Sequence, residues 1–188
     1  MEKAVKRTVL DAIQQRRATR SYTHEPVSEA NVHTLLDAAI YAPSANNTQP
    51  WSFVVIQDPP LLKRISGRAK QELASHPHWK GVHPFTDPKF DIFYGATTLI
   101  VICAGSGGFE PTGDCYLAGE NLMLAAWDLG LATCPIGLAR DVLQSAAMKM
   151  ELGIPAEVTP VLPIIVGHPQ GSMPQTERKT PVIHAWKH

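Results

Sequence analysis

Apolar residues recur every three or four positions in five stretches of the chain, and this spacing predicts amphipathic helices. Residues that begin or end helices flank several of them: Ser28 is a good N-cap, Asp58 precedes two prolines, and Gly130 is a good helix stop. The five predicted helices cover the apolar positions within residues 5–13, 32–40, 62–73, 114–129 and 142–150.

Three shorter runs of β-branched and other apolar residues predict strands at 53–56, 98–104 and 161–167. Pro163 lies inside the last run. Because proline cannot donate a hydrogen bond to a sheet, it indicates an edge strand or a bulge. The chain has 188 residues and no linker or low-complexity segment, so one domain is expected over residues 1–188.

The predicted helix at 114–129 is apolar on nearly all sides, which indicates burial at the centre of the fold and a candidate subunit contact. Glu120, Asn121 and Asp128 interrupt this apolar surface. Since a buried polar group is costly without a hydrogen bond, these three side chains are expected to have partners or to face water.

Charge and cysteine content exclude several classes of protein. The 17 basic residues balance the 17 acidic ones, so no overall charge indicates a nucleic acid or an anionic membrane as partner. The longest apolar run, 99–104, is too short to cross a bilayer, and residues 1–7 do not resemble a signal peptide, which predicts a cytoplasmic protein. Cys103, Cys115 and Cys134 lack the spacing of a disulfide framework or a zinc ribbon and are expected to be buried thiols.

Three segments are candidates for ligand binding, and each also has a purely structural interpretation. Residues 42–51 are mostly small, polar or proline residues, which suit a plain turn or a binding loop. Arg16, Arg17 and Arg20 follow the first predicted helix, where they either complement the helix dipole or clamp an anion such as phosphate. Residues 131–137 are small enough to approach a flat ligand or to form a simple connection.

His76, His78 and His83 lie close together in the sequence and raise the question of a metal site. Neither a nearby Cys or Glu nor an HExxH spacing accompanies them, and prolines interrupt any helical face. No metal is therefore expected, and the role of these histidines stays open.

Taken together, these segments resemble the nitroreductase family over nearly the whole chain. The sequence RRATRSY at 16–22 is similar to the family's RRSxRxF element, and APSANNTQPWSFVVI at 42–56 is similar to APSxxNxQPWxFVVV. ENLMLAAWDLGLATCPIG at 120–137 resembles the family's central helix and its GLGTCWIG turn, and VGHP followed by RK at 178–179 resembles the C-terminal GYP…RK. Ala18 stands where the family usually has a serine.

The resemblance implies an α+β fold of the nitroreductase type: a central mixed or antiparallel sheet flanked by helices, in an intertwined homodimer with FMN at the subunit interface. Arg16 would bind the phosphate of FMN and Arg20 its ribityl chain or N1/O2 edge, while Pro43, Ser44 and Asn47 would come from the other subunit. A backbone N–H of residues 135–137 would lie near N5. The implied cofactor-binding set is Arg16, Arg17, Ala18, Arg20, Pro43, Ser44, Ala45, Asn47, Gln49, Pro135, Ile136, Gly137 and one of Arg178 and Lys179.

The resemblance also implies an oxidoreductase of ping-pong mechanism, in which NAD(P)H reduces the flavin and an electron-poor acceptor such as a nitroaromatic or a quinone reoxidises it. The chemistry then belongs to FMN, and no catalytic side chain is expected. A dehydrogenase, dehalogenase or flavin-fragmenting enzyme of the same superfamily, and a non-catalytic FMN-binding protein, remain open alternatives. Also open are the acceptor, the choice of NADH or NADPH, and whether Trp79, Tyr94 or Phe109 forms the substrate wall.

Overall fold

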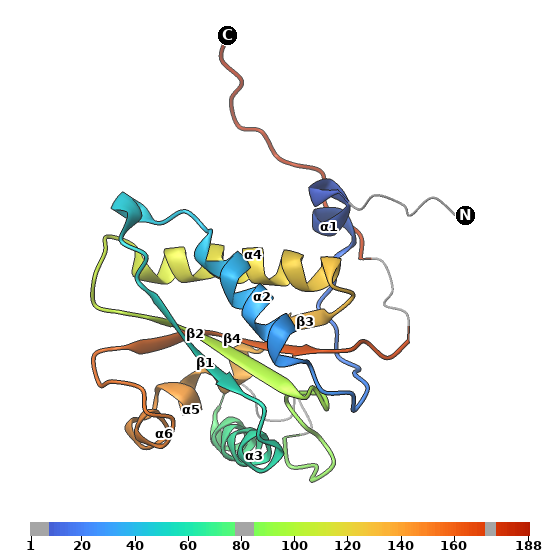
Figure 1. Ribbon diagram of the computed structural model, residues 1–188, viewed down its shortest axis with the longest axis vertical. Coiled ribbons are helices and arrows are strands. Elements are labelled where there is room, and N and C mark those ends of the chain that lie inside the picture. The colour runs from blue at the N-terminus through green and yellow to red at the C-terminus, as the bar shows by residue number, and fades with distance from the viewer. Residues whose placement is uncertain (1–7, 78–84, 172–175) are drawn as a thin grey trace.

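A four-stranded antiparallel sheet in the order β1-β2-β4-β3 forms the centre of the structure (Figure 1). The computed structural model describes residues 8–77, 85–171 and 176–188. The strands are β1 (Trp51–Ile56), β2 (Thr98–Ala104), β3 (Ala132–Pro135) and β4 (Thr159–Gly167). The helices are α1 (Val9–Gln15), α2 (Glu29–Ile40), α3 (Pro59–Ser75), α4 (Pro111–Asp128), α5 (Arg140–Gln144) and α6 (Ala146–Glu151), with short 3₁₀ turns at Ala45–Asn47 and Gly137–Ala139.

Helices cover both faces of the sheet, which explains why β2 is buried along its whole length. Side chains of β2 alternate between two apolar clusters: Leu99 and Val101 face α3 and α5, whereas Ile100 and Ile102 face α2 and α4. Figure 1 shows the same division, with α2 and α4 on one side of the sheet and α3, α5 and α6 on the other. The prediction of an α+β fold with a sheet flanked by helices is confirmed.

Local signals in the sequence set several helix ends as expected. The Ser28 side chain accepts a hydrogen bond from the backbone N–H of Asn31 at the start of α2, and α3 begins at Pro59. One predicted helix is wrong: the pattern at 142–150 is divided between α5 and α6, because Ser145 is in an extended conformation and its side chain caps α6 through the N–H of Met148.

The interpretation of Pro163 is half right. Strand β4 lies between β2 and β3 and is therefore not an edge strand. The pairing of β2 with β4 shifts register between Ile102 and Cys103, which pair with Leu162 and Pro160, so an irregularity does occur in β4, at Val161, two residues before Pro163. Strand β3 ends at the pair Pro135–Ile164, and the Pro163 carbonyl accepts from the N–H of Ile136 at 2.8 Å. Pro163 thus fits an interior strand at a position where the neighbouring strand has just ended.

Helix α4 packs closely on the sheet, and its polar residues have partners as predicted. A side chain at Gly119 would collide with the Leu162 side chain of β4, so glycine permits the close approach. The Asn121 side chain donates to the carbonyl of Ala38 in α2 at 3.2 Å, and Glu120 forms an ion pair with Arg16.

One group of large apolar side chains stays at the surface of α1 and α4. Val9, Leu10 and Ile13 of α1 are 71%, 66% and 52% exposed, and Tyr116 and Leu117 of α4 are 42% and 48% exposed. Only Ala12 is buried on α1, so most of the apolar pattern that predicted this helix does not serve the core of its own chain.

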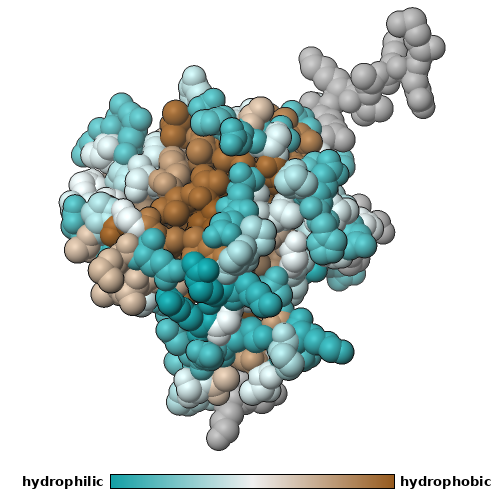
Figure 2. Space-filling view, turned by 60° about the horizontal axis from the view of Figure 1, so that its bottom comes forward, coloured by the Kyte–Doolittle hydropathy of each residue, from teal (hydrophilic) through white to brown (hydrophobic). Residues whose placement is uncertain are grey.

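The space-filling view shows that hydrophobic residues also gather over a contiguous area bordered by polar ones (Figure 2). Such areas often mark sites of association in soluble proteins. None of the helices in the described parts of the chain is both long and apolar enough to cross a membrane.

Candidate functional site

The arginine-rich segment that follows α1 runs along the free edge of β3. Ala18 forms a parallel bridge with Thr133, and the N–H of Thr19 donates to the Thr133 carbonyl at 3.0 Å. Tyr22 anchors the end of this segment: its hydroxyl donates to the Thr19 carbonyl at 2.8 Å, and its ring packs against Gly167, where a Cβ would lie 2.8 Å from the ring. Burial raises the pKa of Tyr22 far above its usual range, so this hydroxyl stays protonated and remains a donor.

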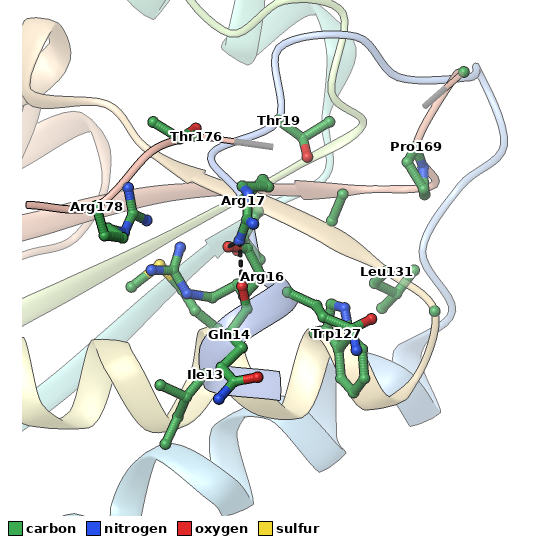
Figure 3. A pocket seen from close by; sticks show the side chains of 16 residues that line it. Ile13, Gln14, Arg16, Arg17, Thr19, Trp127, Leu131, Pro169, Thr176 and Arg178 are labelled. Atoms are coloured by element: carbon green, nitrogen blue, oxygen red, sulfur yellow. Dashed lines mark hydrogen bonds between the residues drawn. The ribbon is translucent and has the colours of Figure 1, made fainter. Parts of the chain in front are cut away.

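A pocket of about 1040 Å³ lies beside this segment, between the end of α1, the C-terminal half of α4 and β3 (Figure 3). Its volume reaches the upper end of the range of about 300–1,000 Å³ that is typical of small-molecule sites. Arginines contributed by distant parts of the sequence converge on it, as the close view shows. The lining residues are Ile13, Gln14, Gln15, Arg16, Arg17, Thr19, Met123, Trp127, Gly130, Leu131, Ala132, Thr133, Pro169, Gly171, Thr176 and Arg178.

Arg16 and Arg17 differ in the contacts that their guanidinium groups make within the protein. Arg17 Nη1 donates to the carbonyls of Gln14 at 2.6 Å and Arg16 at 2.8 Å, so it caps the C-terminal end of α1. Part of the role of Arg17 is therefore structural. Arg16 Nε lies 3.4 Å from Glu120 Oε1, an ion-pair contact whose geometry is not that of a hydrogen bond. The Nε atoms of both arginines are buried and have no hydrogen-bond acceptor among the described residues.

The other predicted residues near the chain ends do not all reach this pocket. Arg178 lines it, whereas Lys179 is exposed and does not belong to its lining. The guanidinium carbon of Arg20 lies 5.9 Å from the ring centre of Tyr94, a cation–π arrangement on the α3 side of the segment. Tyr94 has a positive φ of 53°, in a turn where the Asp91 carboxylate accepts from the N–H groups of Phe93 and Gly95.

Residues 135–137 form the end of β3 and the turn that follows it. Pro135 and Gly137 are exposed, but the Ile136 side chain is buried in the apolar core. The N–H of Ile136 already donates to Pro163, and proline has no N–H. Gly137 is therefore the residue of this triplet whose backbone N–H is available to a ligand.

The polar turn at 43–49 is an ordered structure with unusual backbone geometry. Asn46, Asn47 and Gln49 have positive φ angles of 52°, 55° and 46°, a region that non-glycine residues rarely adopt. The Ser44 hydroxyl accepts from the N–H of Gln49 at 2.9 Å, so this side chain helps to shape the turn. Pro43 and the three positive-φ residues are exposed to solvent, while Ala45 is half-buried.

A single chain does not bring this turn to the arginine pocket. The turn is fastened to Asp114 in the first turn of α4, whereas Trp127 near the end of the same helix lines the pocket. The two residues are thirteen positions apart, which corresponds to about 20 Å along an α-helix. Figure 1 shows the turn at one end of α4 and α1 at the other. The predicted cofactor-binding residues thus form two separate groups in the monomer.

Comparison with known proteins decides the family. The sequence model described as the nitroreductase family matches residues 13–168. The chain belongs to the nitroreductase family. A nitroreductase-family relative from Methanothermobacter thermautotrophicus is 30% identical over 89% of this chain and 80% of its own length, and it is provisionally named an NADH dehydrogenase/NAD(P)H nitroreductase.

Solved structures show the same nitroreductase fold. A nitroreductase from Bacteroides fragilis with bound FMN has a TM-score of 0.86 at 23% identity, covering 97% of this chain and 100% of that one. A protein from Desulfovibrio desulfuricans, provisionally named a nitroreductase and solved in complex with FMN, has a TM-score of 0.69 at 30% identity and covers 93% and 94% of the two chains.

No metal centre is found in this nitroreductase-family chain within 8–77, 85–171 and 176–188, since these ranges contain no group of three or more His, Cys, Asp or Glu side chains placed to hold an ion. His76 belongs to this part of the chain, while His78 and His83 lie outside the described residues, as does Trp79. The three cysteines are buried free thiols, as predicted.

Sequence patterns did not single out Met123, Trp127 or Asp114. Met123 and Trp127 line the pocket, and their spacing of four in α4 places them on one face of the helix. Asp114 holds the polar turn although it is only 5% exposed. A carboxylate within an otherwise apolar helix start is a signal for such a contact, since buried charges need partners.

Proposed function

We propose that this chain is an FMN-dependent oxidoreductase that uses NAD(P)H to reduce an electron-poor small molecule, and that it works as a homodimer with a cofactor site shared between subunits. The observation that carries this proposal is the gathering of Arg16, Arg17 and Arg178, from segments far apart in the sequence, in the lining of one pocket of about 1040 Å³. Guanidinium groups offer planar donor forks that match phosphate and carboxylate oxygens, so three of them at one pocket indicate a ligand with anionic oxygens.

The residues present fit a flavin mononucleotide in composition and in space. Arg16, Arg17 and Arg178 supply positive charge on the pocket wall, as a phosphate dianion requires. Trp127, Met123 and Leu131 supply apolar surface on the same pocket wall. The edge of β3 then leads from the pocket to the exposed Gly137, whose N–H is the expected donor to the flavin ring.

A second copy of the chain would complete the site. The turn at 43–49 presents exposed amide side chains about 20 Å from the arginine pocket of its own chain. A twofold axis near the middle of α4 would bring the turn of one subunit to the pocket of the other. The exposed apolar side chains Tyr116 and Leu117 on α4, together with those of α1, support this position for the interface.

When bound, FMN would supply the two-electron redox chemistry. The protein would orient the cofactor and hold its negative charge, with Arg16 and Arg178 at the phosphate and Arg20 at the ribityl chain or the N1/O2 edge. Reductant and acceptor would react in turn at one open face, which accords with a ping-pong mechanism. The Arg20 guanidinium lies over the Tyr94 ring, which supports Tyr94 as the aromatic residue of the substrate wall.

The deciding experiment is an anaerobic titration of the purified protein. We expect a yellow protein that releases FMN on denaturation. Its visible flavin absorbance should bleach with NADH or NADPH and return when a quinone or a nitroaromatic compound is added. Flavin that binds but does not bleach with either nicotinamide would indicate a non-catalytic FMN-binding protein. A colourless protein that does not bind added FMN would overturn the proposal.

Asn47→Gly should weaken FMN binding about fivefold, because it removes one neutral hydrogen bond worth about 1 kcal/mol. Glycine suits the positive φ of 55° at this position, so the substitution does not strain the turn. Asn46→Gly is the matched control, since Asn46 is also exposed with a φ of 52° but has no place in the proposed site. Fluorescence titration of apoprotein with FMN gives both dissociation constants, and equal values for the two variants would contradict the role of Asn47.

A further inference from the structure

A buried carboxylate connects the polar turn to the central helix. Asp114 is 5% exposed, and both of its carboxylate oxygens lie within hydrogen-bond distance of the Ala45 N–H, Oδ1 at 3.2 Å and Oδ2 at 3.3 Å. The two residues are 69 positions apart in the sequence. Asp114 lies in the first turn of α4, where the positive end of the helix dipole favours a negative charge.

The turn needs an anchor of this kind because its backbone is strained. Positive φ angles at three non-glycine residues, Asn46, Asn47 and Gln49, each cost free energy that the surrounding contacts must offset. The hydrogen bonds inside the turn join residues 44, 45, 47, 48 and 49 to one another. They shape the turn but do not place it on the rest of the protein.

The contact to Asp114 does place it. Ala45 N is the donor at the start of the 3₁₀ turn Ala45–Asn47, so the carboxylate fixes the point from which the strained residues follow. Behind the turn, the N–H of Gly105 donates to the Pro50 carbonyl at 2.8 Å, which secures the far end. With both ends held, the exposed amides of Asn47 and Gln49, which are joined by a hydrogen bond from Gln49 Nε2 to Asn47 Oδ1 at 3.2 Å, are kept at a defined position.

We propose that Asp114 is a positioning residue for the cofactor site of the partner subunit: it holds the 43–49 turn of its own chain in the shape that completes the pocket of the other chain. This inference rests on the proposed FMN function and on the shared site. It adds a residue that touches neither cofactor nor substrate and acts through Ala45. Loss of Asp114 should therefore weaken FMN binding at the pocket of the partner subunit, about 20 Å from the pocket of its own chain.

Two substitutions separate the hydrogen bond from the charge of Asp114. Asp114→Asn keeps the shape and one acceptor oxygen, whereas Asp114→Ala removes the acceptor and leaves the Ala45 N–H without a partner. We expect Asp114→Ala to raise the dissociation constant for FMN about tenfold or more and Asp114→Asn to stay within about threefold of wild type. Thermal unfolding of the apoproteins shows whether each variant is folded.

A mixed dimer tests whether Asp114 acts across the interface. Co-expressed chains carrying different affinity tags allow a dimer to be purified that has Asp114→Ala in one chain and Arg16→Ala in the other. If the turn serves the partner, one site of this dimer combines the intact Arg16 with the intact turn, and the other site combines both defects. Titration with FMN should then reveal one wild-type site per dimer, although each variant homodimer has none.

Other results overturn the inference. If Asp114 acts on the site of its own chain, each site of the mixed dimer carries one defect and neither binds FMN with wild-type affinity. If folded Asp114→Ala binds FMN as wild type does, Asp114 does not position the turn. If Asp114→Asn loses as much affinity as Asp114→Ala, the shared hydrogen-bond acceptor is not what matters. Failure of wild-type protein to bind FMN would instead refute the proposed function, so the two failures are distinguishable.

Discussion

Arg16→Ala should weaken FMN binding by about 2–3 kcal/mol, which corresponds to a dissociation constant about 30–150 times higher. The Arg16 side chain is largely enclosed, with 22% of it exposed, and it lines the pocket. In the proposed site, the substitution would remove a charge-assisted bond from this guanidinium to the phosphate. The substitution also removes the Arg16 partner of the Glu120 carboxylate.

Arg64→Ala is the matched control for the loss of an arginine. Arg64 lies on α3, pairs with Glu151 at 3.0 Å and is not part of the pocket lining. Its removal should leave FMN affinity unchanged, because an exposed ion pair contributes little to stability. Fluorescence titration of the two apoproteins makes the comparison. An Arg16→Ala protein with wild-type affinity would mean that this arginine serves only the end of α1.

Leu117→Glu should break the dimer and with it the cofactor site. Leu117 is 48% exposed on α4 and lies next to Tyr116, in the face that we place at the interface. A carboxylate buried there without a partner costs several kcal/mol in each subunit, and this should raise the dimer dissociation constant more than about 100-fold. Because each proposed site draws on both subunits, FMN should be lost together with the dimer. Sedimentation velocity and the flavin content per chain measure the two effects.

Met150→Glu provides the comparison for Leu117→Glu. Met150 is a large apolar residue that is 81% exposed, but it lies on α6, on the other side of the sheet from α4. Met150→Glu should change neither the mass of the assembly measured by sedimentation nor the flavin content per chain, since an isolated exposed apolar residue is common on protein surfaces. A Leu117→Glu protein that remains a dimer with full FMN content would exclude this face as the interface.

Elements that carry their own signals could be predicted from the sequence. Strand β2 has a continuous apolar run because helices cover both of its faces, and α2 has a capping Ser28 and a regular apolar face. The family resemblance identified the two groups of candidate binding residues, and the structure places Arg16, Arg17 and Arg178 around one pocket.

Features that depend on contacts between distant segments could not be predicted in this way. Strand β3 has only four residues, and the hydrogen bonds that define it come from β4. The division of α5 from α6 depends on the conformation of one residue, Ser145, within a pattern that favours a continuous helix. Pro163 lies in an interior strand because of where β3 ends, which is a property of the folded sheet.

The turn and the pocket lie at opposite ends of α4. For this reason the apparent FMN affinity of the proposed dimer should depend on protein concentration. In the proposed dimer, dilution that separates the subunits also divides every site, so apparent FMN affinity should fall as protein concentration falls. The linkage is reciprocal, because a ligand that binds only the dimer also favours its assembly by mass action. Cofactor supply would then control how much of the enzyme exists in its assembled form.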